Sequence, residues 1–289
     1  MTGISNRTAA TVVAVAVVIA AGIGVWRFQS MRAERSRVEP AATPPIRVPL
    51  FVPADAVRHH GRFAFLWDGP APLASFRQAE KLDAVVAGAG SDEEAARKLM
   101  HWTRAQFEPG TPSPYPPPDA TTTLNEIRSG RTGGFCAQYS FVLVQALQSE
   151  GRPARMVTID GHEVVETWLR DQSRWTMLDP MFDLQVVDRS GRSLSAYEIR
   201  AAGAAGAGLA LTPGHRLTEA PSVYFARYGT IAIWLRNAFT GAPVNFADFD
   251  RYRLWLVAAG EPSPKPESPS TSFPDEVYGP PHGFPVAGS

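Results

Sequence analysis

The stretch "GRPARMVTIDGHEVVETWLRDQSRWTMLDP", residues 151–180, decides the fold of this chain. Three runs within it, 154–159, 163–169 and 174–180, are rich in β-branched and aromatic residues, which is typical of strands. The second and third runs are joined by the polar tetrapeptide "RDQS", and this predicts a β-hairpin. Because the strand-like runs follow one another without an intervening helix, they predict an antiparallel sheet.

The hairpin turn also predicts which side chains meet across the two strands. If the four-residue turn sets the register, Leu169 pairs with Arg174 and Val164 lies opposite Asp179. His162 precedes Val164 by two residues and therefore shares its face of the sheet. Diagonal neighbours lie roughly 7–8 Å apart, so an imidazole and a carboxylate can meet. A one-residue slip would place them on opposite faces, so the pairing of His162 with Asp179 depends on the register.

The stretch "GGFCAQYS", residues 133–140, contains the single cysteine of the chain, Cys136. An apolar periodicity from Cys136 to about Glu150 predicts a helix that Gly151 closes. A cysteine at a helix N-terminus lies beside unpaired N–H groups and the positive end of the helix dipole, which favour a thiolate. The same N–H groups could stabilise an oxyanion. We expect Gly133 and Gly134 to let a substrate carbonyl approach the backbone.

These three side chains form a candidate catalytic triad with distinct roles. Cys136 would attack, His162 would accept its proton and later donate one to the leaving group, and Asp179 would orient the imidazole. Two alternatives remain at this point. A lone cysteine is often a small buried hydrophobic residue. Cys136, His162 and Asp179 could also bind zinc, although catalytic zinc sites favour more histidines and the glycine turn would then have no purpose.

Together these motifs resemble the transglutaminase-like core of the papain-like cysteine enzymes. The resemblance rests on a Gly-x-Cys turn that opens a helix, on "GRPAR" entering a strand, on a His followed by "VETW", and on "LDP" ending the next strand; it covers roughly residues 120–185. It implies that Cys136, His162 and Asp179 are nucleophile, base and orienting acid. The implied chemistry is attack on a peptide or side-chain amide to give a thioester, which water or an amine resolves without a cofactor.

The sequence departs from this family pattern in two places. Glu163 and Val164 follow His162, where many members have a small residue and then Trp. No side-chain oxyanion donor is evident upstream of Cys136; Asn125 and Gln138 carry suitable amides, but the sequence does not place them. There is also no acidic cluster that resembles a calcium site.

The remaining patterns predict an α+β fold for residues 60–260, a transglutaminase-like domain in which the helix that bears Cys136 packs on an antiparallel sheet. Ser91 and Glu94 form a capping box at the start of one helix. A Pro-rich loop at 108–120 precedes a short helix at 121–127, and a further short helix is expected near 194–202.

The N-terminal region predicts a membrane anchor. After a short tail (1–8), residues 9–26 contain no charge and are long enough to cross a bilayer as a helix. A cleaved signal peptide is the alternative, but no convincing cleavage site follows. Basic residues after the span favour a cytoplasmic body, whereas a short tail before one span is typical of a signal anchor with an exported body, which we favour. Residues 27–59 predict a Pro-rich spacer, and residues 261–289 a Pro-rich disordered tail.

Composition narrows the range of functions. The formal net charge is zero, and nothing in it indicates a nucleic-acid partner. One cysteine excludes an intramolecular disulfide and a CxxC metal site. Two hypotheses remain: a membrane-anchored thiol enzyme that acts on a protein or peptide substrate, and an inactive transglutaminase-like binding module in a cell-envelope assembly. We expect Cys136→Ala and His162→Ala to abolish activity with little loss of stability.

Overall fold

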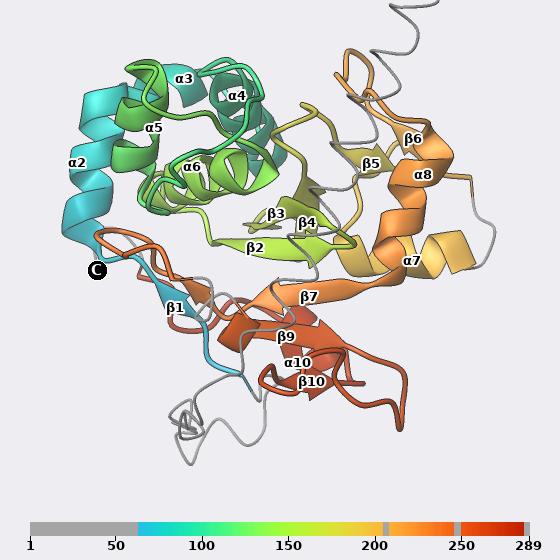
Figure 1. Cartoon of the computed structure of the whole chain (residues 1–289). Coiled ribbons are helices and arrows are strands. Elements are labelled where there is room, and N and C mark those ends of the chain that lie inside the picture. Colours follow the sequence, from blue (N-terminus) through green and yellow to red (C-terminus); the bar gives the residue numbers. More distant parts are fainter. Residues whose placement is uncertain (1–62, 205–207, 246–249, 286–289) are drawn as a thin grey trace, which may run out of the picture. The chain divides into compact units, whose positions relative to one another are not determined.

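The computed structural model describes residues 63–204, 208–245 and 250–285 (Figure 1). The predicted tail, membrane span and spacer of the N-terminal region lie outside the described residues. Most of the helices precede the sheet in the chain. They are α2 (Pro70–Glu80), α3 (Leu82–Val86), α4 (Asp92–Arg104), α5 (Ala120–Arg128), α6 (Cys136–Ser149), α7 (Ala196–Ala204), α8 (Pro221–Ala226), the 3-10 helix η2 (Arg227–Gly229) and α10 (Asp275–Tyr278).

A six-stranded sheet with the order β10-β9-β7-β2-β3-β4 forms the centre of the described region. All neighbouring strands in it are antiparallel except β10 and β9, which are parallel. Two further pairs, β1 with β8 and β5 with β6, lie outside this sheet. The strands are β1 (Leu66–Trp67), β2 (Ala154–Ile159), β3 (His162–Leu169), β4 (Arg174–Leu178), β5 (Val186–Val187), β6 (Ala210–Leu211), β7 (Ile231–Trp234), β8 (Arg236–Asn237), β9 (Arg253–Leu256) and β10 (Ser270–Thr271).

Both faces of the sheet are covered, so the domain has two hydrophobic cores. On one face, side chains of α2 to α6 pack against Met156 and Val165. On the other face, side chains of α7, α8 and η2 pack against Val157 and Val164. Neighbouring residues of one strand point to opposite faces, so β2 and β3 contribute to both cores. Figure 1 shows α2 to α6 gathered on one side of the strands and α7 and α8 on the other.

The expected α+β architecture with an antiparallel sheet is confirmed. The predicted register is also confirmed, because Leu169 pairs with Arg174 and Val165 with Leu178. Continuing this register by one residue places Val164 opposite Asp179. At the start of α4 the Ser91 hydroxyl accepts a hydrogen bond from the Glu94 N–H at 3.1 Å, as the predicted cap requires.

The C-terminal region differs from the predicted disordered tail. Residues 261–285 are described, and they contain β10, which pairs with β9, and α10. Val277 is only 2% exposed, and its carbonyl accepts a hydrogen bond from Arg155 Nη1 at 2.6 Å. Tyr278 donates to Glu166 at 3.1 Å. The segment is Pro-rich over its whole length, which predicts disorder. A few of its residues nevertheless attach it to the sheet, and the composition does not reveal them.

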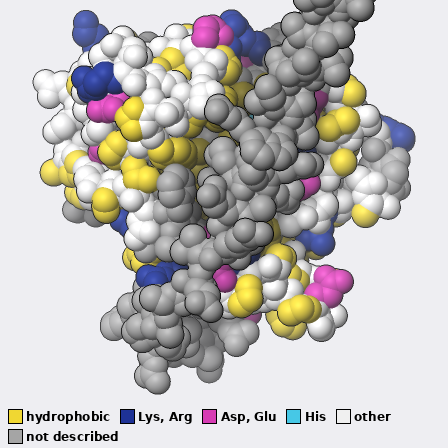
Figure 2. Space-filling model, viewed as in Figure 1, with side chains coloured by type: hydrophobic (Ala, Val, Ile, Leu, Met, Phe, Trp, Pro, Cys, Tyr) yellow, Lys and Arg dark blue, Asp and Glu magenta, His cyan; other side chains and the backbone are white. Residues whose placement is uncertain are grey.

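The described surface mixes charges of both signs. On the face drawn in Figure 2, Lys and Arg side chains lie among Asp and Glu side chains and apolar groups. None of the helices within the described ranges has the length and hydropathy needed to cross a membrane.

Candidate active site

Cys136 is the first residue of α6, and its side chain is partly exposed. Phe135 caps the helix with an extended backbone, and its N–H donates to Gln138 Oε1 at 2.9 Å. The amide of Gln138 thus fixes the turn from which the cysteine projects. From Gln138 onward most of α6 is buried, so this buried helix reaches the surface at Cys136.

The glycine turn before Cys136 packs closely against the loop that precedes it. An added Cβ on Gly133 would lie 2.6 Å from the Gly110 carbonyl carbon and 2.7 Å from the Thr111 oxygen. A Cβ on Gly134 would lie 2.7 Å from the Phe107 ring. The preceding loop therefore occupies the place that a side chain would take at these two glycines, and the approach of a substrate carbonyl to their backbone stays a prediction.

The same loop is joined to the turn by backbone hydrogen bonds. Gly110 N–H donates to the Gly134 carbonyl at 2.9 Å, and Gly133 N–H donates to the Thr111 carbonyl at 3.2 Å. Two strand-like segments can approach this closely only where side chains are missing, and this is the physical need for glycine here.

His162 and Asp179 are in direct contact, as the hairpin register predicts. The distance between His162 Nε2 and Asp179 Oδ2 is 2.7 Å. The histidine is 6% exposed and the aspartate is fully buried. The other carboxylate oxygen, Oδ1, accepts the backbone N–H groups of Met181 at 3.1 Å and Phe182 at 3.2 Å. The turn after β4 therefore holds the carboxylate of Asp179 in a fixed orientation.

The surroundings of His162 favour its charged form. Burial alone lowers the pKa of His162, but the charge of Asp179, the hydrogen bond to it and the contact with Cys136 outweigh burial and raise that pKa to about 10. The imidazole hydrogen-bonds Asp179, and the Cys136 side chain lies close enough to contribute to the raised pKa. Since Nε2 faces the carboxylate, Nδ1 is the nitrogen left for the sulfur. A proton is thus held on the imidazole between a thiol and a carboxylate.

The chain matches the model of one known family over the part that contains these side chains. Residues 80–180 match the family model described as the transglutaminase-like superfamily. This part of the chain is therefore similar to the transglutaminase-like superfamily. The matched residues begin at the end of α2 and include Cys136, His162 and Asp179. No curated protein matches the chain.

Aromatic side chains shield the histidine of the transglutaminase-like core. Phe182 stacks on the imidazole with 5.3 Å between ring centroids, and Tyr224 approaches it edge-on at 6.3 Å. Phe182 and Tyr224 also contact each other. Because these rings exclude water from the bond between His162 and Asp179, that bond lies in a medium of low dielectric constant and is strengthened.

Two ion pairs lie within electrostatic range of His162. Glu163 pairs with Arg253 at 2.7 Å on the α6 side of the sheet. Glu219 pairs with Arg227 at 2.8 Å, and Arg227 also donates to the Asp160 carbonyl at 2.8 Å, next to the turn that leads into His162. Glu163 and Glu219 are thus each paired with an arginine. Asp179 is the acidic residue that bonds His162 directly.

A hydrogen bond joins α6, which begins at Cys136, to β3, which begins at His162. The Ser140 hydroxyl, one turn into α6, donates to the carbonyl of Glu163 at 3.1 Å. Ser140 is fully buried. The contact couples the position of Cys136 to that of His162.

Other residues considered from sequence take different positions. Asn125 lies exposed on α5. His101 pairs with Asp183 through Nδ1 and remains substantially exposed. Within the described ranges, no group of three or more His, Cys, Asp or Glu side chains is arranged to hold a metal ion.

Sequence reasoning missed Phe182 and Tyr224. Phe182 follows the "LDP" motif by two residues, and this proximity is the signal that could have found it. Tyr224 lies 45 residues beyond Asp179 on a helix of six residues, and no periodicity relates the two.

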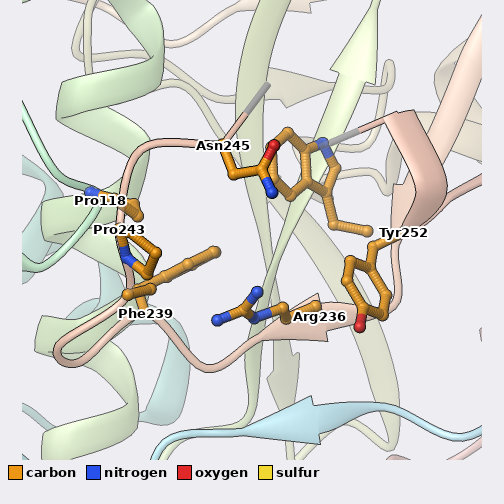
Figure 3. Close-up of a pocket in the computed structure, with 8 residues that line it drawn as sticks. Pro118, Arg236, Phe239, Pro243, Asn245 and Tyr252 are labelled. Atoms are coloured by element: carbon orange, nitrogen blue, oxygen red, sulfur yellow. The ribbon is translucent and has the colours of Figure 1, made fainter. Parts of the chain in front are cut away.

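A separate pocket lies beside the sheet and is lined by Trp234, Arg236, Phe239 and Tyr252, among others (Figure 3). In this view the Arg236 side chain lies between Phe239 and Tyr252. Trp234 Nε1 donates to Thr158 at 2.9 Å, so one wall of the pocket is part of the sheet that carries the active site.

Proposed function

We propose that this chain is a transglutaminase-like cysteine enzyme that attacks peptide or side-chain amides through a thioester. The observation that carries the proposal is the placement of Cys136 at a helix N-terminus beside His162, whose other ring nitrogen bonds the buried Asp179. In the proposed mechanism the thiolate attacks the carbonyl carbon, and His162 gives its proton to the departing amine. Water or a second amine then attacks the thioester, with His162 as the base.

The helix start supplies a further element of the proposed mechanism. Backbone N–H groups of the first turn of α6 have no partner within the helix. Such groups next to the sulfur would stabilise the negative oxygen of the tetrahedral intermediate. No step of this chemistry requires a cofactor or a metal ion.

We further propose that residues 9–26 anchor the enzyme in a membrane, with the body on the extracytoplasmic side. The uncharged span in the sequence supports this proposal. Protease added to intact cells should degrade the body but spare a cytoplasmic control protein. A body that is protected until the cells are lysed would reverse the orientation.

The first test of the chemistry uses the single thiol of the chain. Alkylation by iodoacetamide is followed from about pH 4 to 10 in the full-length wild type, in His162→Ala and in His101→Ala. His101 also pairs with an aspartate but has no thiol beside it, so it is the matched control. Rapid alkylation well below an ordinary thiol pKa of about 8.5, lost only in His162→Ala, is expected.

The outcome separates the enzyme from the binding module. If the thiol titrates normally in all three proteins, the Cys–His pair is absent and the inactive module is favoured. If the pair is present, glutamine-containing peptides with and without a primary amine distinguish the two reactions. Ammonia release without amine incorporation identifies a hydrolase, whereas amine incorporation identifies a transferase.

A further inference from the structure

Asp179 has a second side-chain partner besides His162. Its Oδ2 atom accepts hydrogen bonds from His162 Nε2 at 2.7 Å and from the Tyr224 hydroxyl at 2.9 Å. Both donors therefore share one oxygen, while the other oxygen is held by two backbone N–H groups. A donor that shares an acceptor with the imidazole changes how strongly that acceptor attracts the imidazole's proton.

Tyr224 is in turn held by Tyr228. The Tyr228 hydroxyl donates to the Tyr224 hydroxyl at 3.1 Å. Tyr224 is fully buried and Tyr228 is 1% exposed. Burial raises the pKa of both phenols well above the ordinary value, so both remain neutral donors over the pH range of the site. Hydrogen bonds arranged in one direction polarise one another, and this chain ends on Asp179.

We propose that Tyr224 is a positioning residue of the candidate active site, and that Tyr228 orients and polarises the Tyr224 hydroxyl. Tyr224 takes part of the negative charge of Asp179 and leaves the rest for His162. It thereby sets the pH at which the imidazole releases its proton. Both tyrosines lie on α8 and η2, beyond the residues 80–180 that match the family. The segment that follows the transglutaminase-like core thus completes the site.

The other titratable groups around the pair are accounted for. Glu163 and Glu219 are within range of His162, and each is paired with an arginine. Glu166 is within range of Tyr228 and is paired with Arg155 at 2.7 Å. Asp179 bonds the imidazole directly, and Cys136 is the other titratable group that raises its pKa.

The test compares two alkylating reagents on the full-length chain. Iodoacetate is negatively charged and iodoacetamide is neutral, so the ratio of their rates reports the positive charge beside the thiolate. This ratio should fall where His162 loses its proton. In Tyr224→Phe, Oδ2 attracts the imidazole alone, and the fall should move to higher pH by roughly half to one unit. Tyr228→Phe should produce a smaller shift in the same direction.

Tyr278→Phe is the matched control, because Tyr278 also donates to a buried carboxylate, Glu166, at 3.1 Å. It should leave the profile unchanged even if it lowers the melting temperature as much as Tyr224→Phe does. A Tyr224→Phe profile that superimposes on the wild type, or that moves to lower pH, would overturn the inference. Should Tyr224→Phe fail to fold, Tyr228→Phe decides by the same criterion.

The inference rests on the proposed function, and the experiment separates the two. In the wild type the ratio of the two alkylation rates should show a step with pH, and His162→Ala should abolish this step. The absence of such a step would overturn the Cys–His pair and this inference together. A clear wild-type step with unshifted tyrosine variants would overturn the role of the tyrosines alone.

Discussion

His162 and Asp179 meet at 2.7 Å because the turn between Leu169 and Arg174 sets their strands in register. The contact buries an ionisable pair at the end of the hairpin opposite this turn. The stability of the protein and the chemistry of the candidate site are therefore linked, and variants at this site should affect both.

Cys136→Ala and His162→Ala should differ in their effect on stability, although each should abolish activity. Cys136 is partly exposed, so its loss should change the free energy of unfolding by less than about 1 kcal/mol. Removal of His162 leaves Asp179 buried without its cation, which should cost about 3–5 kcal/mol. This revises the expectation, made from sequence, that both variants keep their stability. Urea unfolding of the two variants measures the difference; equal midpoints would contradict it.

The stability that His162 contributes should depend on pH with a defined sign. Its pKa is about 10 in the folded protein and 6.5 for an ordinary histidine. The contribution is therefore fully present below about pH 6.5 and is lost as the pH rises towards 10. The stability difference between wild type and His162→Gln should shrink over this range, by at most about 1.4 kcal/mol per pH unit. Urea titrations at several pH values test this; parallel curves for the two proteins would refute it.

Gly133→Ala should destabilise the protein and reduce the reactivity of the thiol. The new Cβ would lie within 2.8 Å of three backbone atoms of Gly110 and Thr111, and backbone cannot rotate away. Overpacking of this kind costs about 1–3 kcal/mol. Gly203→Ala is the control, since nothing lies within 4 Å of its Cβ. Thermal unfolding and the alkylation rate together should separate the two variants, and indistinguishable melting curves would speak against the close approach.

Arg155→Met should show how the C-terminal segment is attached. Arg155 and Glu166 are both fully buried, and Arg155 also holds the Val277 carbonyl. The variant leaves Glu166 without a cation, which should cost about 3–5 kcal/mol. Arg128→Met breaks a partly exposed ion pair with Glu80 and should cost about 1 kcal/mol or less. Protease cleavage within residues 261–285 should become faster in Arg155→Met alone.

Short sequence patterns predicted those parts of the structure that depend on interactions within a short segment of the chain. Strand periodicity and a four-residue turn predicted β3, β4 and the contact between His162 and Asp179, because a register follows from its turn. The start of α6 at Cys136 followed from the glycine turn and the apolar periodicity.

Contacts between distant segments could not be predicted in this way. Tyr224 reaches Asp179 from a six-residue helix whose position depends on the second core. The space around Gly133 is taken by a loop that begins more than twenty residues earlier. Val277 and Tyr278 are too few to alter the composition of a Pro-rich segment, yet they attach it to the sheet.

The hydrogen bond from Ser140 to the Glu163 carbonyl has a mechanical consequence. The sulfur belongs to the helical layer, whereas the imidazole and the carboxylate belong to the sheet, so any sliding of α6 along β3 would separate the reacting atoms. Packed helices slide by small shear displacements more readily than they separate. The hydrogen bond from Ser140 to the Glu163 carbonyl lies one helical turn from Cys136. It therefore resists sliding of α6 along β3 close to the sulfur, where a displacement would most reduce reactivity. The reactivity of the Cys136 thiol should therefore depend on how strongly the packing between α6 and β3 resists sliding.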